Sequence, residues 1–192
     1  NIKNIDINDI FWKLEVLPYY IPQEGIIKKQ IKYASNTKEE VIQIQEKLKN
    51  IDYFEEQLIE HIDNPNGRIK FKDQRKISIG ICKKDLLSYR SKKKRAFFNC
   101  FVLIIRIKYN EEFREMHIKV FNTGKLEIPG IQDDKMLEHV LNILISNLNK
   151  HYKENTVTYD TNNIETVLIN SNFNCGFYIN REKLYELLKY KY

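Results

Sequence analysis

The stretch FFNCFVLIIRIK, Phe97 to Lys108, decides the fold, because a run of β-branched and aromatic residues of this length is typical of a strand. Arg114 to Phe121 alternates apolar and polar residues. The turn Asn122-Thr123-Gly124 then leads into KLEIPG, Lys125 to Gly130. Together these segments predict a three-stranded antiparallel meander.

A long amphipathic helix is predicted directly after the meander, from Asp133 to Lys150. Its apolar residues recur at three- and four-residue steps, and they are Met136, Leu137, Val140, Leu141, Leu144, Ile145 and Leu148. Asp133 and Asp134 stand where the positive end of the helix dipole favours carboxylates, an interpretation that we prefer to a metal-binding pair. We expect this helix to cover one face of the meander.

Shorter elements are predicted before the meander. Asn8 to Leu14 has helical spacing and is closed by Pro18, and Ile21 to Tyr33 suits a half-exposed strand. Thr37 to Asp63 opens with a capping box and continues as a charged amphipathic helix, with Asp52 as a candidate break. The first part of the chain should therefore add helices and a strand to the meander.

The remaining segments are more polar. Arg68 to Arg75 is interpreted as a short basic strand or a loop, and His151 to Asn163 as a linker. After the linker, Glu165 to Cys175 predicts another strand and Asn180 to Tyr190 another helix. This order suggests a second structural unit at the end of the chain.

Composition excludes two broad classes of protein. The chain has 192 residues, 30% of them charged, and a mean hydropathy of -0.53, and it contains no apolar run of the roughly 20 residues that a membrane helix needs. Its 42% hydrophobic and 12% aromatic content exceeds what disordered chains carry. The net charge of +6 favours a polyanionic partner if the basic residues gather on one face.

Catalytic and metal motifs are poorly supported, so we expect neither an enzyme nor a cofactor. The chain has no HExxH motif, no glycine-rich phosphate loop and no nucleophile elbow. Its three cysteines form no CxxC pair, which favours a reducing, intracellular environment. The beginning has neither Met nor a signal segment, and the end falls inside a helical pattern, so we expect both ends to be cut from a longer chain.

Two blocks of the sequence resemble TATA-box-binding proteins, most closely the divergent branch of large DNA viruses. FFNCFVLIIRI (Phe97 to Ile107), IKVFNTGKLEIPG (Ile118 to Gly130) and the long helix after them are similar to one lobe of that family. Glu165 to Tyr190, with NSNF at Asn170 to Phe173, resembles the opening strand and helix of the second lobe. The segment Thr37 to Arg75 has no counterpart in the cellular family.

The resemblance implies an α+β fold in which helices cover the convex face of a curved antiparallel sheet. Residues 1–150 would form a nearly complete first lobe that contains a helical insertion near 37–75. Residues 151–163 would be a linker, and 164–192 would begin a truncated second lobe. The family's concave face sits on an opened minor groove, where inserted phenylalanines prise the base steps apart.

The resemblance also implies a DNA-binding set. Phe121 occupies a family phenylalanine slot, Arg106 matches a phosphate-contacting arginine, and Phe98 lies one pleat from Cys100, where a second inserted phenylalanine is expected. The basic run 92–95 would clamp phosphates, or it is a solvated loop. Asparagine amides can donate to minor-groove acceptors. The expected set is Phe98, Arg106, Lys119, Phe121, Lys125, Asn170, Asn172, Lys92, Lys93, Lys94 and Arg95.

The function implied is a non-enzymatic transcription initiation factor of viral type that binds double-stranded DNA and recruits RNA polymerase or a B-type initiation factor, with no membrane partner. It would act in a viral factory, host cytoplasm or nucleus, or in the virion. Glu127 and Pro129 depart from the family pattern, and a carboxylate facing DNA weakens binding. The alternatives are a scaffold that binds proteins without bending DNA, and an enzyme built on a similar helix-backed sheet.

Overall fold

A computed structural model describes residues 6–88, 98–152 and 157–191. The chain divides into two compact units, Asn1–Tyr159 and Asp160–Tyr192. The first unit contains α1 (Ile7–Lys13), β1 (Gly25–Ser35), α2 (Lys38–Leu48), β2 (Phe54–Asp63), β3 (Phe71–Gly80), α3 (Lys83–Leu87), β4 (Cys100–Tyr109), β5 (Glu112–Phe121), β6 (Leu126–Glu127) and α4 (Asp134–Asn149). The second unit contains a short 3-10 turn (Thr161–Asn163) and α5 (Arg181–Lys189).

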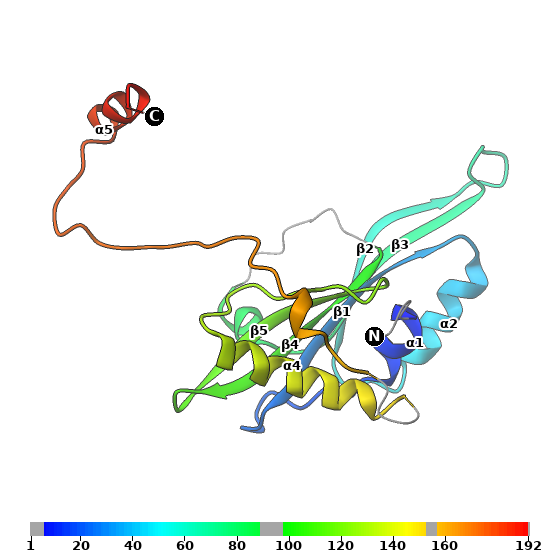
Figure 1. Cartoon of the computed structure of the whole chain (residues 1–192). Helices are drawn as coiled ribbons and strands as arrows, with labels where there is room; N and C mark the ends of the chain where they lie inside the picture. The colour runs from blue at the N-terminus through cyan, green and yellow to red at the C-terminus, as the bar shows by residue number, and fades with distance from the viewer. Residues whose placement is uncertain (1–5, 89–97, 153–156, 192) are drawn as a thin grey trace. The chain divides into compact units, whose positions relative to one another are not determined.

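The first unit is an α+β fold built on one antiparallel sheet of six strands, in the order β2-β3-β1-β4-β5-β6 (Figure 1). The predicted meander is confirmed as β4, β5 and β6. The predicted long helix is confirmed as α4, whose first turn is capped by the Asp133 carboxylate, which accepts a hydrogen bond of 2.8 Å from Met136 N. Asp133 therefore serves as a helix cap.

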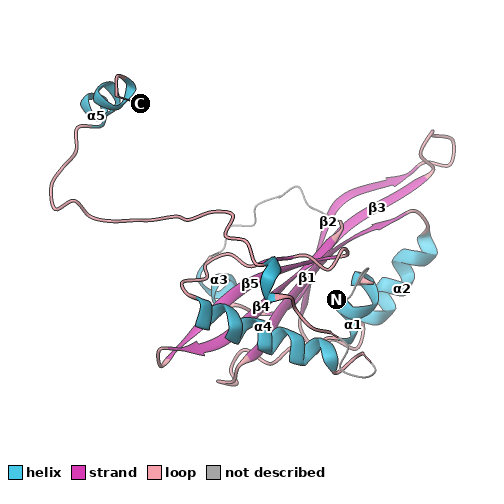
Figure 2. Cartoon of the chain, in the orientation of Figure 1, coloured by secondary structure: helices cyan, strands magenta, loops and turns pink. Residues whose placement is uncertain are grey.

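The alternation along β4 and β5 divides the sheet into two faces. One face, which we call the helix face, packs against α1, α2 and α4 (Figure 2). Its buried strand residues in this region are Phe101, Leu103, Ile105 and Ile107 of β4 and Met116, Ile118 and Val120 of β5. The opposite face, which we call the open face, carries Arg106 and Phe121, so these two residues and α4 lie on opposite sides of the sheet.

Three sequence-based predictions are wrong. Residues 37–63 do not form one long helix, because α2 ends at Leu48 and Phe54–Asp63 is the edge strand β2, paired with β3. The segment 37–75 is therefore one helix followed by most of a β-hairpin, and not a helical insertion. Strand β1 lies between β3 and β4 and is largely buried, whereas a half-exposed strand was predicted.

Glu165 to Cys175 was also predicted to form a strand, and in the described residues it does not. These residues are exposed and have no regular secondary structure. A strand requires a neighbour to complete its backbone hydrogen bonds, and no pairing of this segment is seen within the described part of the chain. The predicted terminal helix is confirmed as α5, which Asn180 caps by accepting a hydrogen bond from Lys183 N.

On the helix face, a cluster of charged side chains joins strands β2 and β3 of the hairpin. Arg75 donates to both carboxylate oxygens of Asp73, at 2.5 and 2.6 Å, and to Glu56 at 2.5 Å. His61 Nδ1 lies 2.9 Å from Asp73 Oδ2, and the Asp73 side chain is inaccessible to solvent. Burial alone would raise the pKa of Asp73, but the hydrogen bonds from Arg75 and His61 hold it below its usual range.

We predict that Asp73→Asn lowers the free energy of unfolding by about 2–3 kcal/mol, because it leaves the Arg75 charge without its main partner. Since the folded-state pKa of Asp73 is depressed, its contribution is complete above the unfolded pKa and is lost as the pH falls below about 4. Urea unfolding at neutral pH measures the loss. Glu60→Gln, which breaks the exposed Lys72–Glu60 pair, is the control and should cost less than about 1 kcal/mol; equal losses would refute this account.

Lys29 fastens β1 to α1 from the helix face. Its ammonium group donates to the carbonyl oxygens of Phe11 at 2.7 Å and Leu14 at 2.6 Å, at the end of α1 where the helix dipole favours a cation. It also lies 4.9 Å from the centre of the Phe11 ring. Burial lowers the pKa of Lys29 to about 8.

This buried lysine should make the free energy of unfolding depend on pH in the alkaline range. The folded-state pKa lies below that of an unfolded lysine, about 10.4, so the unfolded chain binds more protons and stability attributable to Lys29 rises between pH 8 and about 10. The rise should be about 2 kcal/mol, and Lys29→Met should lack it. Urea unfolding of both proteins at pH 7.5 and 10 gives the difference, and parallel pH profiles would contradict the prediction.

Candidate nucleic-acid interface

The open face is organised in rows that run across the strands. One row passes through all six strands by direct register, and it consists of Glu55, Ser78, Gln30, Val102, Lys119 and Glu127. The neighbouring row contains Gln57, Lys76 and Lys32 in register, and Cys100 and Phe121 in register. Lys32 is close enough to Cys100 to influence its ionisation, so the second row continues from β1 to β4.

We call the end of the meander that carries Phe121 on the open face, with Phe98 just before β4, the aromatic end. Phe121 is partly exposed and pairs with Cys100, and Phe98, just before β4, is 39% exposed. Burial raises the pKa of the Cys100 thiol, so the side chain acts as apolar filling between the strands. The turn after Phe121 is closed by a hydrogen bond of 2.9 Å from Phe121 N to the carbonyl of Lys125, whose side chain is exposed.

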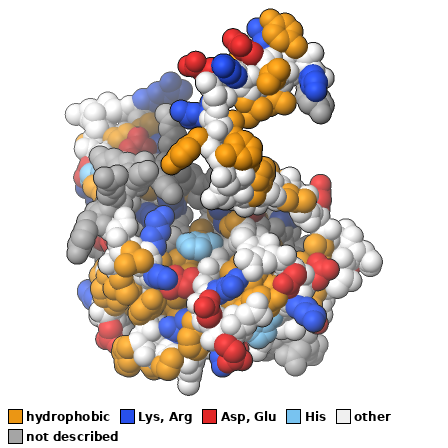
Figure 3. Space-filling view, turned by 90° about the vertical axis from the view of Figure 1, so that its left-hand side faces the viewer, with side chains coloured by type: hydrophobic (Ala, Val, Ile, Leu, Met, Phe, Trp, Pro, Cys, Tyr) orange, Lys and Arg blue, Asp and Glu red, His pale blue; other side chains and the backbone are white. Residues whose placement is uncertain are grey.

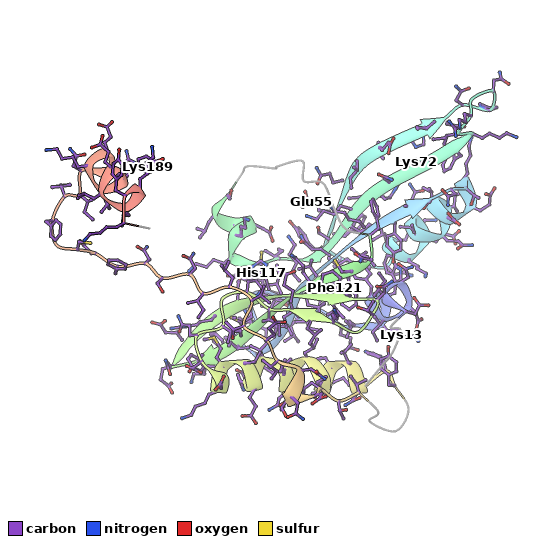
Figure 4. The ribbon with its side chains drawn as sticks, turned by 45° about the horizontal axis from the view of Figure 1, so that its top comes forward. Lys13, Glu55, Lys72, His117, Phe121 and Lys189 are labelled. Carbon is purple, nitrogen blue, oxygen red and sulfur yellow. The ribbon has the colours of Figure 1, made fainter. Side chains whose placement is uncertain are left out.

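Beside this aromatic end, Lys119 and Glu127 form an ion pair of 2.7 Å between β5 and β6. The register confirms that Glu127 shares the face of Lys119 and Phe121. A cation expected to meet phosphate is therefore neutralised by its neighbour. His117 and Phe121 follow one another along β5 in Figure 4.

Arg106 is used inside the protein. Its guanidinium donates to the carbonyl oxygens of Gln23 at 2.8 Å, of Tyr19 at 2.9 Å, and of Ile21. The residue is only 6% exposed. Arg106, which was expected to contact phosphate, instead holds the segment 19–23 against the open face. We therefore do not assign Arg106 to the interface.

The end of the open face away from Phe121 is partly covered by other segments of the chain. Ile27, Ile104 and Cys82 form a small apolar cluster with Leu17 and Tyr19. Lys28 is buried and forms an ion pair of 2.6 Å with Asp85 of α3. Desolvation lowers the pKa of the adjacent His117, a shift that Glu115 partly offsets. Within the described residues, the segment 19–23 and α3 therefore cover part of this end of the open face, while Phe113 at the end of β5 remains 47% exposed.

Several residues of the open face were missed by sequence reasoning. Lys28, Gln30 and Lys32 alternate along β1, and Lys72, Gln74 and Lys76 repeat the same pattern along β3. A Lys-x-Gln-x-Lys pattern in two segments was a usable signal, because period-two spacing places all three residues on one face of a strand. It was obscured where Arg68 to Arg75 was interpreted as an isolated short element.

The other expected site residues lie in the second unit or outside the described residues. Asn170 and Asn172 lie in the exposed, irregular part of the second unit. Lys92, Lys93, Lys94 and Arg95 lie outside the described residues. Figure 3 shows basic and acidic side chains interspersed among the described residues on the face that it presents.

No group of three or more metal-ligating side chains lies together in residues 6–88, 98–152 and 157–191. In the same residues, none of the helices has the length and apolar character needed to span a bilayer. Comparisons of the chain with models of protein families, with curated proteins and with solved structures find no match. The proposed function is therefore based on the residues of the open face.

We predict that Arg106→Met loosens the segment 19–23, because three carbonyl groups lose a buried charged donor. The free energy of unfolding should fall by about 2–3 kcal/mol. Limited proteolysis should show new cleavage near Gln23. Lys108→Met, an exposed cation two residues along β4, is the control; the same cleavage pattern in both variants would show that Arg106 does not hold the segment.

Proposed function

We propose that the chain is a TATA-box-binding-like module of a viral-type transcription initiation factor, which binds duplex DNA through the open face. One observation carries the proposal. The three helices that pack on the main core lie on one side of the sheet, and the other side presents Phe121 and a row of lysine and glutamine side chains, with Phe98 exposed just before β4.

The chemistry of this surface suits a minor groove. Partly exposed phenylalanines can insert between base steps, and this insertion bends the duplex. Amide and ammonium groups donate to the acceptors on the groove floor and to phosphates. Five basic residues stand at positions 90–95 with no acidic residue among them, and the net charge of the whole chain is +6, so this run accounts for most of the net positive charge. This run would add phosphate contacts.

Recruitment of RNA polymerase or a B-type factor is part of the same proposal and follows from the resemblance. The helix side of the sheet would remain available to such partners when the open face is occupied. The module then acts without chemistry of its own, by bending DNA and holding proteins beside it.

A second candidate function, a scaffold that binds proteins and not DNA, is favoured by the charge pattern. Lys28, Lys72 and Lys119 are each paired with a carboxylate on or beside the open face. The edge strand β2 exposes Phe54 and Leu58 and carries several acidic residues. An unpaired, partly apolar strand edge is a surface to which another protein strand can add.

The test is duplex binding by the intact chain, measured by fluorescence anisotropy, with bending measured by energy transfer between the duplex ends. Phe98→Ala and Phe121→Ala should each weaken binding about tenfold or more and reduce the bend, because one stacked or inserted aromatic contributes about 1–3 kcal/mol. Phe54→Ala is a matched control, because Phe54 is 40% exposed but lies on the helix face.

A charge variant tests the same surface independently. Glu127→Gln releases Lys119, so DNA affinity should increase several-fold and the salt dependence should steepen by about one phosphate contact. Absence of duplex binding by the wild-type chain would refute the DNA proposal. If the wild type binds DNA and neither Phe98→Ala nor Phe54→Ala changes the affinity, the interface lies elsewhere.

A further inference from the structure

Strand β2 is one edge of the sheet, and no strand in residues 6–88, 98–152 and 157–191 pairs with its outer side. The carbonyl of Tyr53 accepts a hydrogen bond from Gly80 N of β3, so by alternation the backbone groups of Phe54 and Leu58 point away from β3. The side chains of Phe54, Leu58 and Ile59 are exposed. This edge therefore combines backbone donors and acceptors with apolar side chains, as strand-pairing surfaces do.

The acidic residues of β2 are largely neutralised by cations of the same chain. Three of the four carboxylates on the strand form ion pairs. The pairs are Glu56–Arg75, Glu60–Lys72 and Asp63–Lys38, at 2.5, 2.8 and 2.6 Å. Neutralised carboxylates attract a basic peptide only weakly and repel another acidic strand only weakly. The charge of the edge is therefore compatible with a partner strand of the same composition.

A bulge in the middle of β2 restricts the strands that can pair along its whole length. The pairing with β3 shifts by one residue between Leu58 and Glu60, so Ile59 is an extra residue. A regular strand laid along this edge would leave that residue unmatched. A second copy of β2, antiparallel to the first and with Leu58 of one opposite Ile59 of the other, matches every residue from Phe54 to Asp63 one to one.

This bulge-to-bulge register also matches the two faces of the strand. In their pairing with β3, Glu55, Gln57, Glu60 and Ile62 lie on the open face. The opposed pairs in the register are Phe54–Asp63, Glu55–Ile62, Glu56–His61, Gln57–Glu60 and Leu58–Ile59. Open-face residues therefore oppose open-face residues, and helix-face residues oppose helix-face residues. No carboxylate stands directly opposite another carboxylate, so the register avoids the like-charge pairs that destabilise a sheet.

We infer that the outer edge of β2 is a dimer interface, where two copies of the chain pair antiparallel along Phe54–Asp63. Antiparallel pairing of identical strands requires a two-fold axis perpendicular to the sheet. The dimer would therefore have one sheet of twelve strands, six from each copy, with both open faces on the same side. This inference is independent of the proposed DNA binding, because it concerns the edge of the sheet and not the open face.

The experiment measures the mass of the intact chain by sedimentation equilibrium at about 1 to 100 µM, without DNA. The wild type should show a monomer–dimer equilibrium in this range. Leu58→Lys places one ammonium group from each copy at the centre of the paired strands, and it should raise the dissociation constant at least about tenfold. Leu86→Lys is the matched control, because Leu86 of α3 and Leu58 are both 55% exposed; this variant should dimerise like the wild type.

A cross-link tests the register itself. In a background with Cys175→Ser, which removes the exposed cysteine, Gln57→Cys with Glu60→Cys should form a disulfide-linked dimer on oxidation, because residues 57 and 60 of the two copies are opposed. Gln57→Cys alone should not, because the two copies of residue 57 are then about 10 Å apart along the strands.

Two outcomes would overturn the inference. One is a wild-type chain that stays monomeric up to about 100 µM. The other is a dimer that Leu58→Lys and Leu86→Lys leave equally stable, which would place the interface outside the β2 edge. Neither outcome bears on the proposed DNA binding, because no duplex is present in the experiment.

Discussion

The period-two alternation of β4 and β5 beneath α4 is the constraint on which the rest of the structure depends. Phe101, Leu103 and Ile105 must be buried, and α4 supplies the apolar stripe that buries them. Because successive strand residues point to opposite faces, this burial also fixes Cys100, Val102 and the register-paired residues of β5 on the open side. A slip of one residue would turn the apolar set toward solvent and the aromatic end into the core.

On β1 and on the meander strands, lysine side chains of the open face are paired with carboxylates. Glu127 pairs with Lys119, and Asp85 pairs with Lys28. Most of the net positive charge of the chain stands at positions 90–95 in the sequence, and Lys32 and Lys76 lie opposite each other on the hairpin side. In the proposed complex with DNA, phosphate contacts would therefore come mainly from the basic run and the hairpin side, and the meander would contribute its aromatic side chains.

The meander, α4 and the division of the sheet into two faces could be predicted because they depend on local period and turn residues. The hairpin could not be predicted in the same way. Ile51, Phe54, Leu58 and Ile62 recur at helical steps, and only pairing with β3 shows that Phe54–Asp63 is a strand. The partner of Arg106 was equally hidden, because the segment 19–23 reaches it only through the tertiary fold. Long-range pairing decides both cases, and sequence periodicity carries no information about it.

The most direct test of the account measures which face of the sheet a duplex protects. Lysine acetylation followed by mass spectrometry, with and without a duplex of about 14 base pairs, gives the reactivity of each lysine in one experiment. The account predicts that Lys32, Lys76 and Lys119 are protected, while Lys38 and Lys135, on helices of the other face, react as they do without DNA. Protection of the helix-side lysines, with Lys32, Lys76 and Lys119 unchanged, would contradict it.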